Sequence, residues 1–318
     1  MGIWMEIIEF LKEKGPGKAL VFGMGGGGDI IATVPTASFL KEFGFEVFHG
    51  SIVWDRYIID SKPGPRSLEE LTQIDRINET VAIACEKTRI SEDVKPTVAR
   101  AAEHFEKVIA LDITKGPERL AEGIKDFMSR YGVSVVIAVD SGGDVLASGF
   151  ESGVRSPLAD AVSLAALSRI RDSLVGVFGF GSDGELRIEE ILIQISELLK
   201  IGAFVGCIAM GRKDCMMMEN ITKDVTTEAS MIPLRAFKGE MGFTKIRMGR
   251  TVPLFPISIL TFFFRADGVF EKNRLAKEIL KTRNIHEARE ILNRMGIFTE
   301  MDFEYMISRK GIPWDEQE

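Results

Sequence analysis

Histidine and cysteine are scarce in this chain of 318 residues, which contains three of each. Cys85, Cys207 and Cys215 form no CxxC pair and no spacing with histidine that would indicate a zinc site or a disulfide framework. Because imidazole and thiolate groups are so few, we expect any chemistry to depend on carboxylates, backbone amides and a bound metal ion.

Long apolar runs are also missing. No stretch approaches the ~18 apolar residues that a membrane-spanning helix needs, and the longest run, residues 257–264, has the length of a buried strand. The first fifteen residues have no basic start and include Glu6 and Glu9, so they do not resemble a signal peptide. We therefore expect a soluble, cytoplasmic protein without a membrane partner.

An excess of positive charge is absent as well. The formal net charge is −7 and the isoelectric point is near 5.3, which argues against a nucleic-acid partner. Apolar residues make up 45% and charged residues 27%, the balance of an ordinary globular protein. Asn and Gln are few while Glu, Lys, Arg and Ile are plentiful, a pattern found in thermophilic proteins.

Apolar, β-branched runs alternate with amphipathic stretches along the chain. Strands are expected at residues 19–23, 45–49, 80–85, 108–112, 133–139, 174–178, 204–209 and 257–264. Helices are expected at residues 33–43, 92–105, 117–130, 157–170 and 185–200, with another opening at the capping box 67–70. Because the strands are apolar on both faces, the pattern predicts an α/β, Rossmann-like fold: a mostly parallel sheet with helices on both faces.

The chain shows no internal repeat and no flexible linker, so residues 1–318 are predicted to form a single domain. Residues 1–264 would supply the sheet and its covering helices, and residues 265–318 a helical C-terminal extension. Residues 243–253 alternate with period two, which is typical of an antiparallel hairpin or flap, and this segment carries Arg247 and Arg250 as candidate anion ligands.

Three of the expected strands end in the same way, with a glycine turn and an acid before a helix. The acids are Asp29 after the first strand, Asp140 and Asp144 after the strand at 133–139, and Asp183 after the strand at 174–178. Parallel strands end at one edge of a sheet, so these carboxylates are expected to converge there. Converging carboxylates are suited to Mg²⁺ or Mn²⁺. The alternative is that each acid only caps a helix or a turn.

The first of these turns contains a run of four glycines, Gly25, Gly26, Gly27 and Gly28, whose amides could cradle a phosphate. Together with Gly23 the run matches GxGxxG after a strand. NAD is nevertheless not expected as a cofactor, because the second strand does not end in an acid that would hold the ribose.

Four further residues are candidate site residues. Glu185 is a candidate general base. Arg66 and Arg155 lie in proline-containing loops and are candidates to hold a substrate anion, with plain surface arginines as the alternative. Asp160 falls in the first turn of its helix, where it would contribute to substrate binding or only complement the helix dipole.

Several phrases of the sequence resemble an uncharacterised prokaryotic family of conserved hypothetical proteins. They are GMGGGGD (23–29), PGPRS (63–67), VDSGGDVLASG (139–149), RSPLADA (155–161), FGSDGEL (180–186), TEAS (227–230) and GRTVPL (249–254). The likeness implies that these segments belong to one family pattern spanning nearly the whole chain. It assigns no role to any residue.

The residues favour a metal-dependent enzyme, expected to be a hydrolase or phosphatase that acts on a small phosphorylated or otherwise anionic metabolite. Two other interpretations stay open. One is a nucleotide- or dinucleotide-binding protein, a sensor or an oxidoreductase, without catalytic metal. The other is a structural or regulatory homo-oligomer in which the acidic turns only cap helices.

Overall fold

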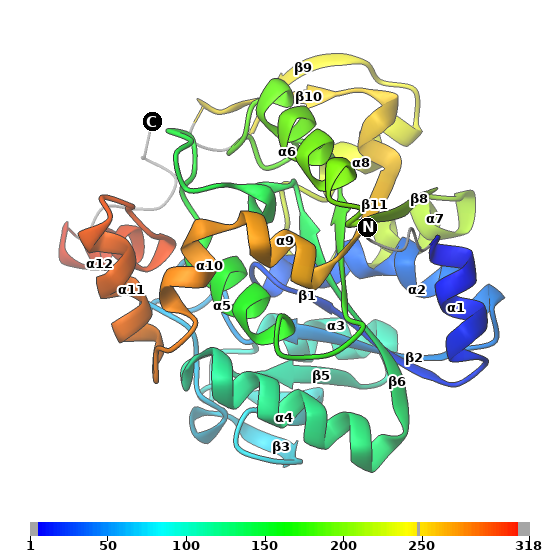
Figure 1. The fold of residues 1–318 in the computed structure, drawn as a ribbon. Helices are drawn as coiled ribbons and strands as arrows, with labels where there is room; N and C mark the ends of the chain where they lie inside the picture. Colours follow the sequence, from blue (N-terminus) through cyan, green and yellow to red (C-terminus); the bar gives the residue numbers. More distant parts are fainter. Residues whose placement is uncertain (1–5, 247–248, 311–318) are drawn as a thin grey trace.

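The computed structural model describes residues 6–246 and 249–310 and shows a central sheet between two layers of helices (Figure 1). Within that part of the chain the main sheet has nine strands in the order β3-β4-β5-β2-β1-β6-β7-β11-β8. Their bounds are β1 Lys18–Gly23, β2 Glu46–Ile52, β3 Thr72–Arg76, β4 Val81–Arg89, β5 Val108–Leu111, β6 Val133–Ser141, β7 Leu174–Phe178, β8 Phe204–Ala209 and β11 Leu260–Arg265.

The central strands pair in parallel, from β5 through β2, β1 and β6 to β7. Every residue of β5 and β7 is buried, as expected for strands covered on both faces. The predicted α/β class is therefore confirmed. The sheet is mixed at its margins, because β4 and β11 run antiparallel to their neighbours.

Several elements differ from the sequence prediction. The strand expected at 257–264 begins only at Leu260, because Pro256–Ile259 form a 3₁₀ turn, and the helix expected at 185–200 begins at Ile188. The capping box of Ser67 and Glu70 is present, but it opens a single 3₁₀ turn, Leu68–Glu70, rather than a helix. The chain is extended from Leu71 onward and enters β3, which pairs with β4. The helix expected at 92–105 begins only at Thr97, because Pro96 stands at its N-cap.

The helices divide between the two faces of the sheet. Apolar residues of α1, α2, α3, α7 and α8 share one buried cluster, and those of α4, α5, α6, α9, α10 and α11 share the other. The helices up to α8 are α1 Ile7–Lys14, α2 Thr33–Glu42, α3 Thr97–Phe105, α4 Gly116–Tyr131, α5 Pro157–Leu167, α6 Ile188–Lys200, α7 Arg212–Ile221 and α8 Met231–Phe237. Every residue of α5 is buried, so this helix lies at the centre of its layer.

The C-terminal segment is helical over its described part, as predicted. Its helices are α9 Ala266–Lys272, α10 Arg274–Ile279, α11 Ile285–Arg294 and α12 Glu300–Lys310. Val269, Leu275 and Leu292 belong to the same buried cluster as α5, so these helices share the core of the sheet. Residues 311–318 of the predicted extension lie outside the described part.

The period-two segment forms the predicted hairpin. β9, Gly242–Lys245, pairs antiparallel with β10, Thr251–Leu254, as a small separate sheet. Arg250 precedes β10, and Arg247 lies outside the described residues.

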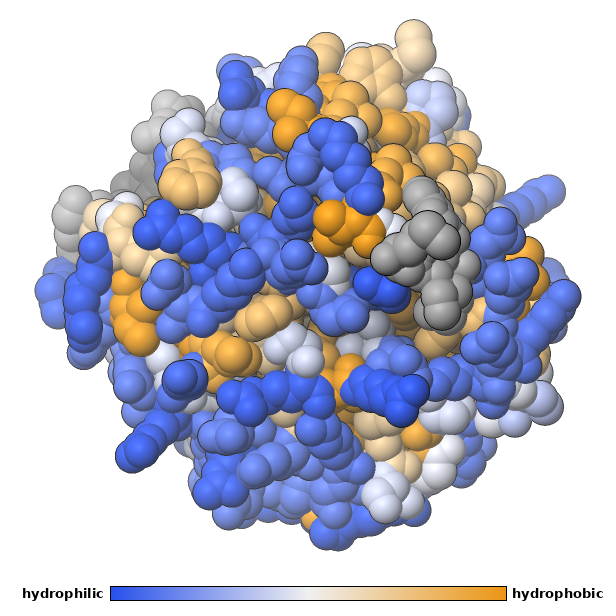
Figure 2. Space-filling view, in the orientation of Figure 1, coloured by the Kyte–Doolittle hydropathy of each residue, from blue (hydrophilic) through white to orange (hydrophobic). Residues whose placement is uncertain are grey.

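The molecular surface in the orientation of Figure 1 is mostly hydrophilic, with apolar side chains in scattered patches (Figure 2). Among the described residues, none of the helices combines the length and the apolar character needed to cross a bilayer.

Candidate metal centre and substrate cavity

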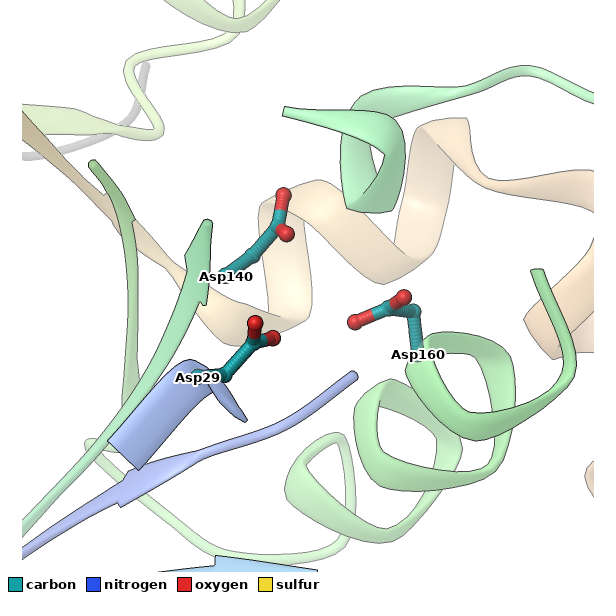
Figure 3. Close-up of side chains that lie close together, drawn as sticks. All are labelled: Asp29, Asp140 and Asp160. Carbon is teal, nitrogen blue, oxygen red and sulfur yellow. The ribbon is translucent and has the colours of Figure 1, made fainter. Parts of the chain in front are cut away.

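Three aspartates from separate elements lie together at the carboxyl edge of the parallel strands. Asp29 lies in η1, a 3₁₀ turn at Gly27–Ala32 directly after β1, Asp140 lies at the end of β6, and Asp160 lies in the first turn of α5. One carboxylate oxygen of each lies within 4.8 Å of the others. Figure 3 shows the three carboxylates pointing toward one another.

The backbone around β1 holds these elements in place. β1 and β6 are neighbours, and the Met24 amide donates a hydrogen bond of 3.0 Å to the Val139 carbonyl, directly before Asp140. On the other side, the Ser163 hydroxyl of α5 donates to the Met24 carbonyl at 3.0 Å. Met24 therefore links the strand that precedes Asp140 to the helix that carries Asp160.

Burial makes the charged form of these carboxyl groups costly. Asp140 and Asp160 are 1% and 4% exposed. Desolvation, followed by repulsion from the neighbouring acids, raises the pKa of both well above 3.8. Desolvation also raises the pKa of the partly buried Asp29 to about 7. The Oδ1 atom of Asp160 is buried without a hydrogen-bond partner. A cation between the three groups would relieve both the repulsion and the missing contact.

Asp144 and Asp183 lie beside this triad and line the same cavity. The Asp144 side chain lies close enough to those of Asp140 and Asp183 to lower the pKa of both by hydrogen bonding, which offsets part of the increase caused by burial. Desolvation, then the charge of Glu185, raises the pKa of Asp183 to about 6. The expected convergence of the acidic turns is thus present. The group with metal-ligand spacing, however, contains Asp160 in place of Asp144 and Asp183.

Glycine is required in the turn after β6. Gly142 has φ +135°, and a Cβ atom there would lie 2.3 Å from the Asp183 carboxyl carbon. The Gly142 amide donates to the Phe178 carbonyl at 2.8 Å, and its carbonyl accepts from the Gly181 amide at 2.7 Å. These bonds tie the turns after β6 and β7 together, which brings Asp183 to Asp140.

The four-glycine run packs around the carboxylates and offers fewer free amides than expected. The Gly25 amide donates to Asp29 Oδ2 at 3.0 Å, and the Gly27 amide donates to the Trp54 carbonyl at 2.9 Å. Neither amide is therefore free for a phosphate. A Cβ atom on Gly25 would lie 2.7 Å from Asp29 Oδ2 and 3.1 Å from Asp160 Oδ2, so this glycine leaves room for two carboxylates of the triad.

Glu185 lines the cavity but has its oxygens occupied. Oε2 accepts from the Arg155 and Ser156 amides at 2.6 and 2.9 Å, and Oε1 accepts from the Ser156 hydroxyl at 2.5 Å and from Arg250 at 3.3 Å. These contacts anchor the chain at the start of α5. The geometry favours a positioning residue over the predicted general base.

The two predicted anion ligands have different positions. Arg66 is 1% exposed, pairs with Asp60 at 2.5 Å and donates to the Gly64 carbonyl at 3.0 Å. The geometry gives no support to its prediction as a substrate ligand, because this side chain bonds within its own loop and is not among the residues that line the cavity. Arg155 does line the cavity, although its guanidinium donates to the Ser152 carbonyl at 3.1 Å.

The cavity has a volume of about 420 Å³ and lies over the acidic turns. Acidic residues, arginines and aromatic residues line it, among them Asp29, Asp140, Asp144, Asp160, Asp183, Glu185, Glu300, Glu304, Arg56, Arg155, Arg250, Trp54, Phe298 and Phe303. This volume lies within the usual range of ligand pockets, roughly 300–1,000 Å³, and it can hold a small phosphorylated metabolite.

A family model described as "Protein of unknown function (DUF1152)" matches residues 20–308. The chain belongs to this family. The match confirms the resemblance to an uncharacterised family, and it spans every residue of the candidate site. Comparisons with curated proteins and with solved structures found no match.

Sequence reasoning missed two glutamates of α12. Glu300 accepts from the Leu158 and Ala159 amides at 3.0 and 2.8 Å, and burial raises its pKa to about 8. Glu304 accepts from Trp54 Nε1 at 3.2 Å and from the Gly64 amide at 2.7 Å. No local motif distinguishes these acids from the many others of a charged helical segment.

Arg56 was also missed, in a loop without secondary structure. Its side chain lies 3.7 Å from Glu228, and desolvation lowers its pKa. Arg250 is close enough to lower it further by repulsion. Two guanidinium groups from distant segments therefore line the same cavity. Arg250 was a candidate from the flap pattern, whereas nothing in the sequence around Arg56 marks it.

Proposed function

We propose that this protein is a metal-dependent hydrolase that acts on a small phosphorylated or otherwise anionic metabolite. Asp29, Asp140 and Asp160 would hold the ion. The observation that carries the proposal is the meeting of their carboxylate oxygens within 4.8 Å at the floor of a cavity. Oxygen-only ligands favour Mg²⁺ or Mn²⁺ over softer metals.

The buried, unpartnered oxygen of Asp160 supports a cation at this place. A buried carboxylate is stable only with a proton, a hydrogen-bond donor or a positive ion. Asp160 Oδ1 has no donor in the described structure, and its neighbours Asp29 and Asp140 are acids as well. A divalent ion would replace the repulsion among the three groups by attraction.

The substrate anion is assigned to the arginines rather than to the glycine run. Arg56 and Arg250 expose 28% and 25% of their side chains and repel each other. An anion between two guanidinium groups relieves that repulsion, and the planar fork of arginine matches phosphate oxygens. The amides of Gly25 and Gly27 are already engaged, which also weakens the nucleotide-binding interpretation that needs them.

The proposed reaction is hydrolysis of a phosphate ester. Water attacks phosphorus, the bond from phosphorus to the ester oxygen breaks, and the products are the alcohol and inorganic phosphate. The attacking water loses one proton and the departing alcohol oxygen gains one. A bound divalent ion would lower the pKa of water and neutralise charge on the phosphoryl oxygens. Asp144 and Asp183, which line the cavity beside the triad, would take and return the proton.

The first test is metal binding by EDTA-stripped protein, followed by its thermal midpoint with Mg²⁺, Mn²⁺ or Ca²⁺. A ligand at a hundred times its dissociation constant adds about 2.7 kcal/mol to stability. We expect Mg²⁺ or Mn²⁺ to raise the midpoint of the wild type and to leave Asp140→Asn unchanged. Release of inorganic phosphate from a panel of phosphate esters then tests the hydrolase.

Two neighbouring glycines give a matched pair of variants for the same test. Gly25→Ala places a methyl group between two ligands of the triad, whereas in Gly26→Ala the nearest atom is the Trp54 carbonyl oxygen at 3.7 Å. The metal shift should disappear in Gly25→Ala and persist in Gly26→Ala. A wild type that shows no shift with any ion, or a shift that survives both Asp140→Asn and Gly25→Ala, would overturn the metal site.

A further inference from the structure

Part of the cavity wall is aromatic and is used by none of the steps above. Trp54, Phe298 and Phe303 line the cavity, the first from the loop after β2 and the others from the start of α12 and the residues before it. Hydrolysis of a phosphoryl group needs the carboxylates and the arginines only. We therefore expect the aromatic side chains to contact the part of the substrate that does not react.

Phe298 is unusual among the large apolar side chains of the described residues. It is 45% exposed, and it is the one exposed member of that set that lines the cavity. A half-exposed phenyl ring at the rim of a polar site has apolar area left for a ligand to cover. Aromatic rings prefer offset or edge-to-face contact with another flat ring.

Trp54 fixes the distance between the aromatic wall and the triad. Its indole Nε1 donates to Glu304 of α12 at 3.2 Å, and its carbonyl accepts from the Gly27 amide at 2.9 Å. One residue thus connects α12, which carries Phe303, with the turn that carries Asp29. A small molecule with an anion at one end and a ring at the other would contact both walls.

We infer that the substrate is a phosphate monoester whose alcohol part carries a flat aromatic ring, as in a nucleoside monophosphate or an aryl phosphate. The ring stacks on Phe298 while the phosphate lies at the triad and the arginines. This inference rests on the proposed hydrolase. Stacking of a base on an aromatic side chain contributes about 1–3 kcal/mol, which corresponds to roughly 5- to 150-fold in affinity.

The test compares three esters in saturating Mn²⁺: adenosine monophosphate, phenyl phosphate and glycerol phosphate. Apparent dissociation constants come from thermal midpoints against ester concentration, and kcat/KM from phosphate release. We expect at least one ring-bearing ester to bind about tenfold more tightly than glycerol phosphate and to react with higher kcat/KM. If only adenosine monophosphate binds more tightly than glycerol phosphate, the site recognises a nucleoside. If both ring-bearing esters do, the site accepts aryl groups in general.

Phe298→Ala is the critical variant, with Phe150→Ala as its control, since Phe150 is 77% exposed and does not line the cavity. Phe298→Ala should remove the preference for ring-bearing esters while the Mn²⁺ shift and glycerol phosphate binding stay unchanged, and Phe150→Ala should keep the preference. If the wild type binds all three esters equally, or if Phe298→Ala loses the same factor in affinity for all three, the inferred ring-binding site is wrong. The proposed hydrolase would not be affected by either result. Absence of the Mn²⁺ shift itself would instead count against the proposed function.

Discussion

Single carboxyl groups of the site couple its stability to pH. In the unfolded chain an aspartate loses its proton near pH 3.8, whereas Asp29 in the folded protein has a pKa of about 7. Between these values the folded state binds more protons than the unfolded state. The stabilisation that comes from the protonated Asp29 is therefore fully present below pH 3.8 and is lost as the pH rises through 7.

We predict that metal-free protein is less stable at pH 8 than at pH 5. For Asp29, with a pKa of about 7, the loss is roughly 3 kcal/mol, and Glu300, with a pKa of about 8, adds to it. Urea unfolding in EDTA at the two pH values measures the difference, which should be smaller in Asp29→Asn. Saturating Mn²⁺ should reduce the difference too, since the ion replaces the protons. If the free energy of unfolding in EDTA instead increases from pH 5 to pH 8, the raised pKa of Asp29 and Glu300 in the folded protein is contradicted.

The N-terminus of α5 depends on residues that lie far along the chain. Its N-terminal amides are satisfied by two acids far along the chain, because Glu185 accepts from the Ser156 amide and Glu300 from those of Leu158 and Ala159. These bonds hold the first turn of the helix, and with it Asp160, at the edge of the sheet. α12 thereby positions a proposed metal ligand, Asp160, that it does not itself carry.

We predict that Glu300→Ala lowers the free energy of unfolding by about 1–3 kcal/mol, because it leaves two amides of α5 without their acceptor. The metal shift should also become smaller as Asp160 loses its fixed position. Glu290→Ala on the surface of α11, where Glu290 is 64% exposed, is the control and should change stability by less than about 0.5 kcal/mol. Urea unfolding at pH 7 compares them, and equal stability of the two variants would show that the cap is dispensable.

Across the whole molecule, the C-terminal helices belong to the core rather than to an appendage. Val269, Leu275, Ile279 and Leu292 are 0–1% exposed and lie in the same buried cluster as the sheet and α5. Covering a large apolar side chain contributes about 1.5–3 kcal/mol, so the loss of these four side chains alone approaches the total stability of a typical domain, about 5–15 kcal/mol.

We predict that a chain ending at residue 264 does not fold. Expression of this truncated chain should yield aggregated protein, or soluble protein without a cooperative urea transition, while the full chain unfolds in a single step. Circular dichroism against urea concentration measures both. A truncated chain that unfolds cooperatively near the wild-type midpoint would show that residues 265–318 are a separable extension.

The sequence by itself determined the α/β class and the edge at which the acids gather. Both follow from local patterns, since apolar runs on both faces indicate buried parallel strands, and the carboxyl ends of such strands share one edge. The acids Asp29, Asp140, Asp144 and Asp183 were identifiable for this reason alone.

Only the tertiary structure decided which side chains meet. Strand order and the reversed direction of β4 and β11 depend on pairing between distant segments. Asp160 lies beside Asp29 and Asp140 because the Ser163 hydroxyl of the same helix donates to the Met24 carbonyl. Arg66 lies away from the cavity, where it pairs with Asp60. Local periodicity records which face of an element is buried. It does not record the partner across that face, and these partners determine a side chain's hydrogen bonds, its pKa and its access to the cavity.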